Sequence, residues 1–181
     1  MKNLILQHFD GEMGELENRS VENIKEYAKM VGAEYQLITG KPFRKHLTAP
    51  CQKVYMIDEV WDEYDTIVML DIDMFAPKGM TKNIFEDPGI GLYSDTQKML
   101  HNKIVGAIYK LDKPTRKKLR AELGGNEAWM QNYNKRYNFG DEGIMHTLAV
   151  KAGIKVKKNA VRDANQIIMQ KPLWVNYMKS G

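Results

Sequence analysis

The stretch IVMLDIDMF, residues 67–75, decides the fold. Its first four residues form an uninterrupted apolar run, which is typical of a strand buried on both faces of a sheet. Asp71 and Asp73 follow this strand, one residue apart. In extended backbone, side chains at positions i and i+2 point the same way, so both carboxylates are expected to project together from the strand's carboxyl end. That end is where open α/β sheets bind their ligands.

The Asp-x-Asp pair predicts a metal site. Two carboxylates held this close repel one another, and a divalent cation is the simplest counter-charge. Their hard oxygens suit Mg²⁺ or Mn²⁺, ions that also keep coordination positions for phosphate oxygens. An Asp-x-Asp pair also arises by chance, and the alternative is a solvated strand end with two ordinary surface acids. The apolar strand that precedes the pair favours the metal site.

The residues before this strand predict a β-α-β unit. Residues 3–9 form a short apolar run typical of a buried strand. Ser20 is a candidate N-cap for a helix over residues 21–31, with Gly32 placed to end it. Residues 34–39 are the second strand candidate. Because a helical crossover joins parallel strands, we expect these two strands to run in the same direction.

The rest of the chain predicts a less regular arrangement of helices and strands. The expected helices are residues 50–64, 114–123 and 141–152, and the expected strands are residues 89–93, 104–109 and a closing strand within 154–161. No Ser/Gly-rich linker and no internal repeat divides the sequence. We therefore expect one α/β domain over residues 1–181, with residues 1–75 and 76–181 as its two halves.

Composition excludes several classes of protein. Hydrophobic residues make up 43% and charged residues 28%, which excludes a disordered or collagen-like chain. The net charge of +4 permits an anionic partner without demanding nucleic acid, and no nucleic-acid partner is expected. One cysteine, Cys51, excludes an internal disulfide and an all-thiolate zinc site. With no long apolar run and no secretory leader in this sequence, a cytoplasmic protein without a transmembrane segment is expected.

One run of basic residues opens a non-enzymatic alternative. Six cations fall within eleven residues: Lys110, Lys113, Arg116, Lys117, Lys118 and Arg120. Such a run is typical of a solvated helix face, and the alternative is a binding module for nucleic acid or an anionic membrane surface. The motifs GxxxxGK[ST], GxSxG and HExxH are absent from the sequence, so these give no competing active site.

The order of these motifs resembles nucleotide-sugar glycosyltransferases of the GT-A fold, especially the glycogenin-like family 8 group and related small viral or bacterial transferases. The segment YDTIVMLDIDMF, residues 64–75, is similar to that family's YDKVLYLDADVLV. FEDPGIGLYSD, residues 85–95, resembles the strand that leads into the donor site, and PLWVNYMKSG, residues 172–181, resembles the family's C-terminal segment. The resemblance implies a Rossmann-like mixed sheet flanked by helices, with the Asp-x-Asp pair at a central strand end.

The resemblance also implies a role for individual residues. Asp71 and Asp73 would hold Mn²⁺ or Mg²⁺ against the donor diphosphate. The other residues implied on the donor side are His8, Phe9, Asp10, Lys53, Asp95 and Lys179. Asn102, Asp141 and Glu142 would lie on the acceptor side, with Asp141 and Glu142 as the catalytic candidates. Solvent-facing positions are the alternative for Lys53, and a helix N-terminus favours acids such as Asp141 and Glu142 for purely structural reasons.

The third metal ligand departs from the family pattern. The family usually has a histidine where this chain has Asn176. An asparagine can coordinate through its carbonyl oxygen, which is a harder ligand than imidazole. Asn176 is therefore expected as the third ligand beside Asp71 and Asp73.

The expected activity is metal-dependent transfer of a hexose from a nucleotide diphosphate sugar, UDP-linked, to a hydroxyl of a glycan, protein or lipid acceptor. Family 8 resemblance implies retention of the anomeric configuration. The second enzyme class is a phosphohydrolase like the haloacid dehalogenases, whose first motif is also a buried strand that ends in Asp-x-Asp. In that hypothesis Asp71 is the nucleophile and Asp73 the general acid.

Overall fold

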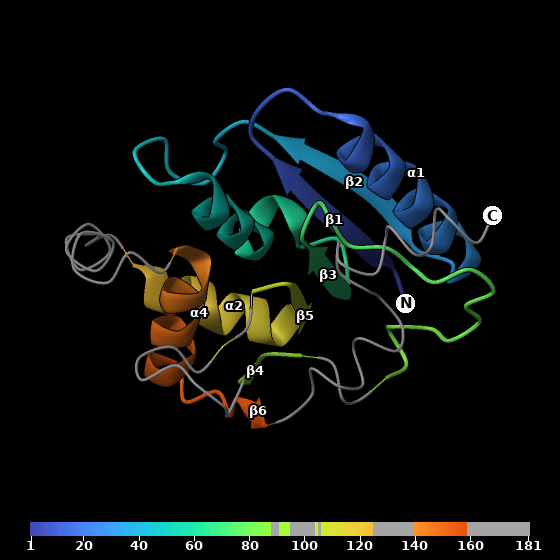
Figure 1. Ribbon diagram of the computed structural model, residues 1–181. Helices are drawn as coiled ribbons and strands as arrows, with labels where there is room; N and C mark the ends of the chain where they lie inside the picture. The colour runs from blue at the N-terminus through green and yellow to red at the C-terminus, as the bar shows by residue number, and fades with distance from the viewer. Residues whose placement is uncertain (88–90, 95–103, 105, 125–139, 159–181) are drawn as a thin grey trace.

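The computed structural model describes residues 1–87, 91–94, 104, 106–124 and 140–158 of the chain (Figure 1). The strands are β1 (Asn3–Phe9), β2 (Glu34–Thr39), β3 (Thr66–Leu70), β4 (Tyr93–Ser94), β5 (Ile108–Asp112) and β6 (Lys157–Lys158). The α-helices are α1 (Glu15–Met30), α2 (Lys113–Leu123) and α4 (Gly140–Lys151). Two 3₁₀ helices, η1 (Ala49–Ile57) and η2 (Glu59–Trp61), lie between β2 and β3. Within these ranges no helix combines the length and apolar character that a membrane span needs.

A four-stranded mixed sheet in the order β2-β1-β3-β5 forms the centre of the fold. β1 pairs in parallel with both β2 and β3, and β5 runs antiparallel to β3. Alternate residues of β1 and β3 face opposite sides of the sheet, as the period of a strand requires. Ile5 and Val68 pack with α1, whereas Leu6 and Met69 pack in the core that contains η1, α2 and α4. Figure 1 shows the sheet between these two layers of helix.

The β-α-β unit and the central strand are confirmed. β1 and β2 have the expected bounds, they run parallel, and β3 is buried on both faces. The N-cap prediction is wrong, because α1 already begins at Glu15 and Ser20 lies buried inside it. Gly14 is the N-cap, and its N–H donates to the side chain of Glu17 at 2.9 Å. The Glu17 carboxylate therefore satisfies the N–H of the N-cap residue, which is the glutamate half of a capping box.

Residues 50–64 do not form one continuous helix. The extended backbone of Asp58 divides the segment into η1 and η2, and the Asp58 side chain accepts a hydrogen bond from the Val60 N–H at 3.1 Å. Val60, within η2, is 54% exposed. Trp61 and Tyr64 remain buried, so the remaining apolar face still packs against the sheet.

The second half agrees with the sequence prediction for helices better than for strands. α2 and α4 lie within a residue of their expected bounds. The strand expected at 104–109 begins only at Ile108, because the chain bends at Gly106 and Ala107. Of the strand expected at 89–93, residue 93 lies in β4, Tyr93–Ser94, which pairs with β6, whereas residues 91–92 form a bend. Residues 88–90 and the part of the closing strand after Lys158 lie outside the described residues.

The basic run is not a uniformly solvated helix face. Arg116 is fully buried, and its guanidinium donates to the carbonyls of Leu111, Trp61 and Tyr64 at 3.1, 3.2 and 2.6 Å. Arg120 pairs with Asp62 at 2.8 Å, and the Lys110 ammonium donates to backbone carbonyls at residues 84–87. Half of the six cations thus serve internal contacts, which weakens the hypothesis of a basic binding module.

Arg116→Ala is expected to lower the free energy of unfolding by about 3 kcal/mol or more, because three buried carbonyls lose their donor. Urea denaturation measures the change. Lys117→Ala, an exposed neighbour on the same helix, is the matched control and is expected to stay within about 0.5 kcal/mol of wild type. Equal stability of the two variants would contradict the internal role of Arg116.

A candidate active site at the carboxyl edge of the sheet

A cavity of about 430 Å³ lies at the carboxyl ends of β1 and β3. Five parts of the chain contribute to its wall: the end of β1, η1, the turn after β3, the bend before β5 and the start of α4. The lining residues are His8, Phe9, Asp10, Ala49, Pro50, Lys53, Asp71, Ile72, Asp73, Gly106, Asp141 and Glu142. This edge of the sheet is where α/β folds place ligands.

The cavity brings together eight of the residues singled out in the sequence: His8, Phe9, Asp10, Lys53, Asp71, Asp73, Asp141 and Glu142. They come from four segments that are far apart in the chain, so their convergence is a property of the fold. The other four, Asp95, Asn102, Asn176 and Lys179, lie outside the described residues.

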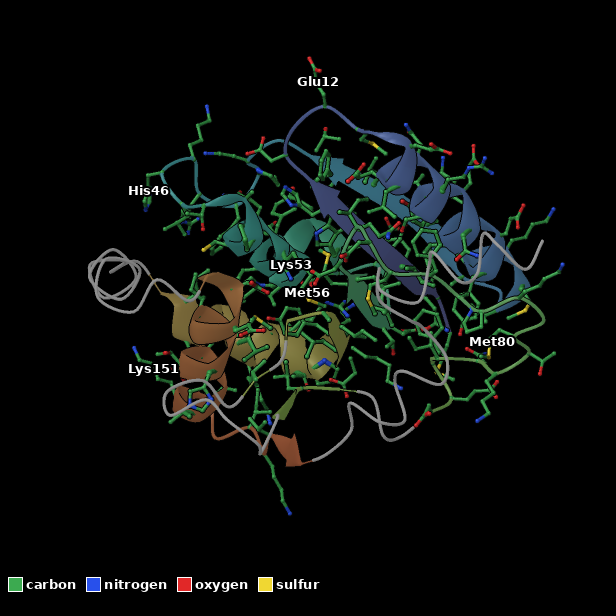
Figure 2. All side chains as sticks on the ribbon, in the orientation of Figure 1. Glu12, His46, Lys53, Met56, Met80 and Lys151 are labelled. Atoms are coloured by element: carbon green, nitrogen blue, oxygen red, sulfur yellow. The ribbon has the colours of Figure 1, made fainter. Side chains whose placement is uncertain are left out.

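Lys53 joins three sides of the cavity. It lies on η1, and its Nζ is 2.5 Å from Asp71 Oδ1 and 3.0 Å from Asp141 Oδ2. The ammonium also donates to the Gly106 carbonyl at 2.8 Å, so each of its three hydrogens has an oxygen partner. Lys53, labelled in Figure 2, therefore lies where η1, the end of β3 and the start of α4 meet.

The charge of Lys53 is maintained by its two carboxylate neighbours. Its side chain is only 9% exposed, and burial by itself lowers the pKa of an ammonium. Asp141 and Asp71 outweigh this effect and raise the pKa of Lys53 above its usual range. The site therefore contains a permanent buried cation between one buried carboxylate, Asp141, and one that is 36% exposed, Asp71.

The Asp-x-Asp pair lies on a turn and not on extended strand. β3 ends at Leu70, and the Met74 N–H donates to the Asp71 carbonyl at 3.2 Å, which closes a turn over residues 71–74. The expectation that both carboxylates follow the alternation of an extended strand is therefore wrong. Both residues still line the cavity, because the turn itself lies at its edge.

Asp141 and Glu142 are held in place at the start of α4. The Tyr109 hydroxyl donates to Asp141 Oδ2 at 2.6 Å, and the Gly106 N–H donates to Glu142 Oε1 at 2.8 Å. Burial, with Asp141 beside it, raises the pKa of Tyr109 well above its usual range, so the hydroxyl keeps its proton. Burial also raises the pKa of Glu142 above that of an exposed glutamate. A carboxylate with a raised pKa beside a cavity is suited to proton transfer.

His8 lines the same cavity as a neutral side chain. It is buried at the end of β1, and its Nε2 lies 2.7 Å from the Gly40 carbonyl. Burial lowers the pKa of His8, so the ring is neutral at pH 7 and Nε2 carries the proton that is donated to Gly40. Asp71, Asp141 and Lys53 thus contribute charged groups to the cavity lining, and His8 contributes a neutral polar one.

The donor set of this cavity fits a divalent cation. Its described lining contains five carboxylates, those of Asp10, Asp71, Asp73, Asp141 and Glu142, against one ammonium. An anionic ligand such as a diphosphate needs an added positive charge to bind there. The described residues hold no cluster of three or more His, Cys, Asp or Glu side chains that could hold a metal alone. A cation at Asp71 and Asp73 would share its coordination with ligand oxygens, as Mg²⁺ does in phosphate sites.

Two residues that sequence analysis did not assign to the site are essential to its geometry. A Cβ on Gly106 would meet Asp141 Oδ2 at 2.7 Å and the Tyr109 hydroxyl at 3.0 Å, so a larger residue there would have to displace the Asp141 carboxylate. A glycine inside an apolar, strand-like run is a signal of close backbone approach, and Gly106 carried that signal. Nothing in the local sequence distinguishes Tyr109 from an ordinary core tyrosine.

No protein-family model matches the chain, and no curated protein matches it by sequence. Solved structures match it by fold. One is a glycosyltransferase involved in glycosylation of the major capsid of PBCV-1, with 13% identity, a TM-score of 0.58 and coverage of 94% of this chain and 93% of that chain.

Two further matches are structures of Drosophila β1,4-galactosyltransferase 7. Its catalytic domain in complex with xylobiose has 18% identity, a TM-score of 0.56 and coverage of 93% of this chain and 70% of that chain. A mutant in complex with manganese, UDP-Gal and xylobiose has 17% identity, a TM-score of 0.54 and coverage of 87% and 65%. The chain therefore has a glycosyltransferase fold, and the mixed sheet flanked by helices confirms the expected GT-A-like architecture.

Lys53→Met is expected to lower the free energy of unfolding by about 3 kcal/mol, because the buried carboxylate of Asp141 loses its counter-charge. Chemical denaturation of Lys53→Met, Asp141→Asn and the double variant measures the coupling between the two residues. The double variant is expected to be more stable than the sum of the single changes predicts. Additive effects would contradict a direct ion pair.

Proposed function

We propose that this protein is a metal-dependent glycosyltransferase that transfers a hexose from a nucleotide diphosphate sugar to a hydroxyl acceptor. One observation carries the proposal: in a glycosyltransferase fold, the cavity at the carboxyl edge of the sheet gathers Asp71, Asp73, Asp141 and Glu142 around the buried cation of Lys53. The match to solved glycosyltransferase structures favours the transferase over the phosphohydrolase, the other enzyme class expected from the sequence.

In this proposal the donor binds between the end of β1 and the turn at residues 71–74. Asp71 and Asp73 would hold Mn²⁺ or Mg²⁺, with Asn176 as the further ligand implied by the resemblance. The bound cation would neutralise charge on the departing diphosphate. His8, Phe9 and Asp10 would lie beside the base and ribose, since they line the same cavity. The matched structure that contains manganese and UDP-Gal supports a UDP-linked donor.

Lys53 acts in this proposal by holding Asp71 in place. Its three hydrogens already have partners on Asp71, Asp141 and Gly106, so the ammonium fixes the donor-side carboxylate relative to the start of α4. Its positive charge also lowers the repulsion between those carboxylates and an incoming diphosphate. Lys179 and Asp95 stay implied donor-side residues on the strength of the resemblance.

Asp141 and Glu142 face the acceptor in this proposal, with Asn102 implied beside them. Glu142 would accept the proton of the attacking hydroxyl, and its raised pKa makes it a stronger base than an exposed glutamate. Asp141, fixed by Tyr109 and Lys53, would hold the helix start that carries Glu142. The acceptor is a glycan, protein or lipid hydroxyl, and xylobiose in a matched structure favours a glycan. The family 8 resemblance implies that the anomeric configuration is retained. The coupling constant of the anomeric proton in the product would test this.

Asp71→Asn and Asp73→Asn are each expected to abolish Mn²⁺-dependent binding of a UDP-sugar and its turnover, because each removes a charged oxygen ligand. Thermal-shift titration of UDP-, GDP- and CMP-sugars, with and without Mn²⁺, measures binding, since a ligand of the native state raises the melting temperature. Glu26→Gln, an exposed change on α1, is the control and is expected to match wild type. Unchanged UDP-sugar hydrolysis in Asp71→Asn would refute the proposed site.

The acid limb of the pH–rate profile is expected to report Glu142. The general base must be ionised, so kcat/KM falls as the pH is lowered through the pKa of Glu142. Burial raises this pKa, so the fall begins at a higher pH than for an exposed glutamate. Glu142→Gln is expected to lower kcat about 10²-fold or more and to remove this limb. Glu122→Gln, exposed on α2, should keep the wild-type profile, and an unchanged limb in Glu142→Gln would assign the base elsewhere.

A further inference from the structure

Gln7 is a fully buried amide in β1 that does not line the cavity. Its Nε2 donates to the Asp71 carbonyl at 3.1 Å and to Ser20 Oγ at 2.9 Å, and its Oε1 accepts from the Tyr35 hydroxyl at 2.9 Å. The amide therefore uses both of its hydrogens and its oxygen. Each partner lies on a different element: the turn after β3, α1 and β2.

Ser20 continues this chain of hydrogen bonds to the other end of the turn. Its hydroxyl accepts from Gln7 and donates to the Met74 carbonyl at 2.7 Å. Asp71 and Met74 are the first and last residues of the turn that carries the Asp-x-Asp pair. Gln7 and Ser20 together, named the turn clamp from here on, thus hold the carbonyl at each end of that turn.

We propose that the turn clamp positions the carboxylates of Asp71 and Asp73 for metal and donor binding, and the inference rests on the proposed function. Inside the turn, the Met74 N–H to Asp71 carbonyl bond is 3.2 Å long, and the clamp adds two bonds from fully buried side chains. Buried hydrogen bonds are strong and directional, because no water competes for them. A pair of carboxylates on a short turn keeps a defined separation only while the turn is held.

Polar side chains are a costly choice at these two positions. Burying an amide and a hydroxyl is unfavourable unless each is fully hydrogen-bonded, and apolar residues would fill the same space without that cost. The three residues that precede Gln7 in β1, Leu4, Ile5 and Leu6, are apolar and fully buried. Core packing alone does not require polar residues at positions 7 and 20, and the need to hold the turn accounts for Gln7 and Ser20.

α1 offers a matched control for the clamp. Two turns after Ser20, the Tyr27 hydroxyl donates to the Lys82 carbonyl at 2.9 Å and accepts from the Ile84 N–H at 3.0 Å. Ser20 and Tyr27 are both buried, lie on the same helix and bind loop backbone through a hydroxyl. Only Ser20 binds the turn at residues 71–74. Ser20→Ala and Tyr27→Phe therefore each remove one buried hydroxyl. Ser20→Ala frees the Met74 carbonyl of the turn, whereas Tyr27→Phe frees the backbone at Lys82 and Ile84.

The experiment titrates Mn²⁺ against the full-length chain at a fixed UDP concentration, well below the melting temperature of every variant. Ser20→Ala is expected to raise the Mn²⁺ concentration for half-maximal UDP binding about 10-fold. Loss of a group that orients a metal ligand typically weakens metal affinity by about 10- to 100-fold, and this is the lower limit. Tyr27→Phe is expected to leave that midpoint unchanged, although both variants lower the melting temperature. Gln7→Met, a second variant with the same expected direction, removes the bond to Asp71.

The outcomes separate the two proposals. Failure of the wild type to bind UDP in a Mn²⁺-dependent manner would overturn the proposed function, and the inference with it. Normal binding by the wild type with an unchanged midpoint in Ser20→Ala would overturn the turn clamp alone. An equal shift in Ser20→Ala and Tyr27→Phe would also overturn it, because general loosening of the loop would then explain the effect.

Discussion

The fold and its candidate site depend on one buried interaction, the Lys53 ammonium between Asp71 and Asp141. An isolated charge in this position would be expelled or neutralised, so the three groups require one another. The ammonium joins η1, the end of β3 and the start of α4, three segments that are far apart in the sequence. Gly106 completes the arrangement, because the absence of a side chain there lets backbone and carboxylates approach closely. The stability of the core and the geometry of the cavity are therefore consequences of the same contacts.

Much of the first half could be predicted from the sequence, because it follows strong local patterns. The uninterrupted apolar run before Asp71 identifies the central strand, and the β-α-β order determines the parallel pairing of β1 with β2. The gathering of His8, Lys53, Asp71 and Asp141 around one cavity agrees with the residues that the family resemblance pointed to. Local pattern did not reveal the turn at residues 71–74, whose two end carbonyls are bound by Gln7 and Ser20 from other elements.

Two of the wrong predictions have a common physical cause. Ser20 has the side chain of an N-cap, yet its hydroxyl is used on a backbone carbonyl far along the chain. Arg116 lies in a run that resembles a solvated face, yet it is fully buried because three inward-facing carbonyls need a donor. In each case a polar side chain satisfies a buried backbone group of another element, and tertiary contacts of this kind leave no periodic trace in the sequence.

The reversed direction of β5 has a consequence for how this fold can vary. The chain leaves the sheet at Asp71 and re-enters it next to the same point, where the Asp71 N–H donates to the Ala107 carbonyl at 3.0 Å. The two ends of the intervening stretch are thus hydrogen-bonded to each other at the edge of the cavity. The stretch between these two fixed points can therefore vary in length without altering the order β2-β1-β3-β5 of the central sheet.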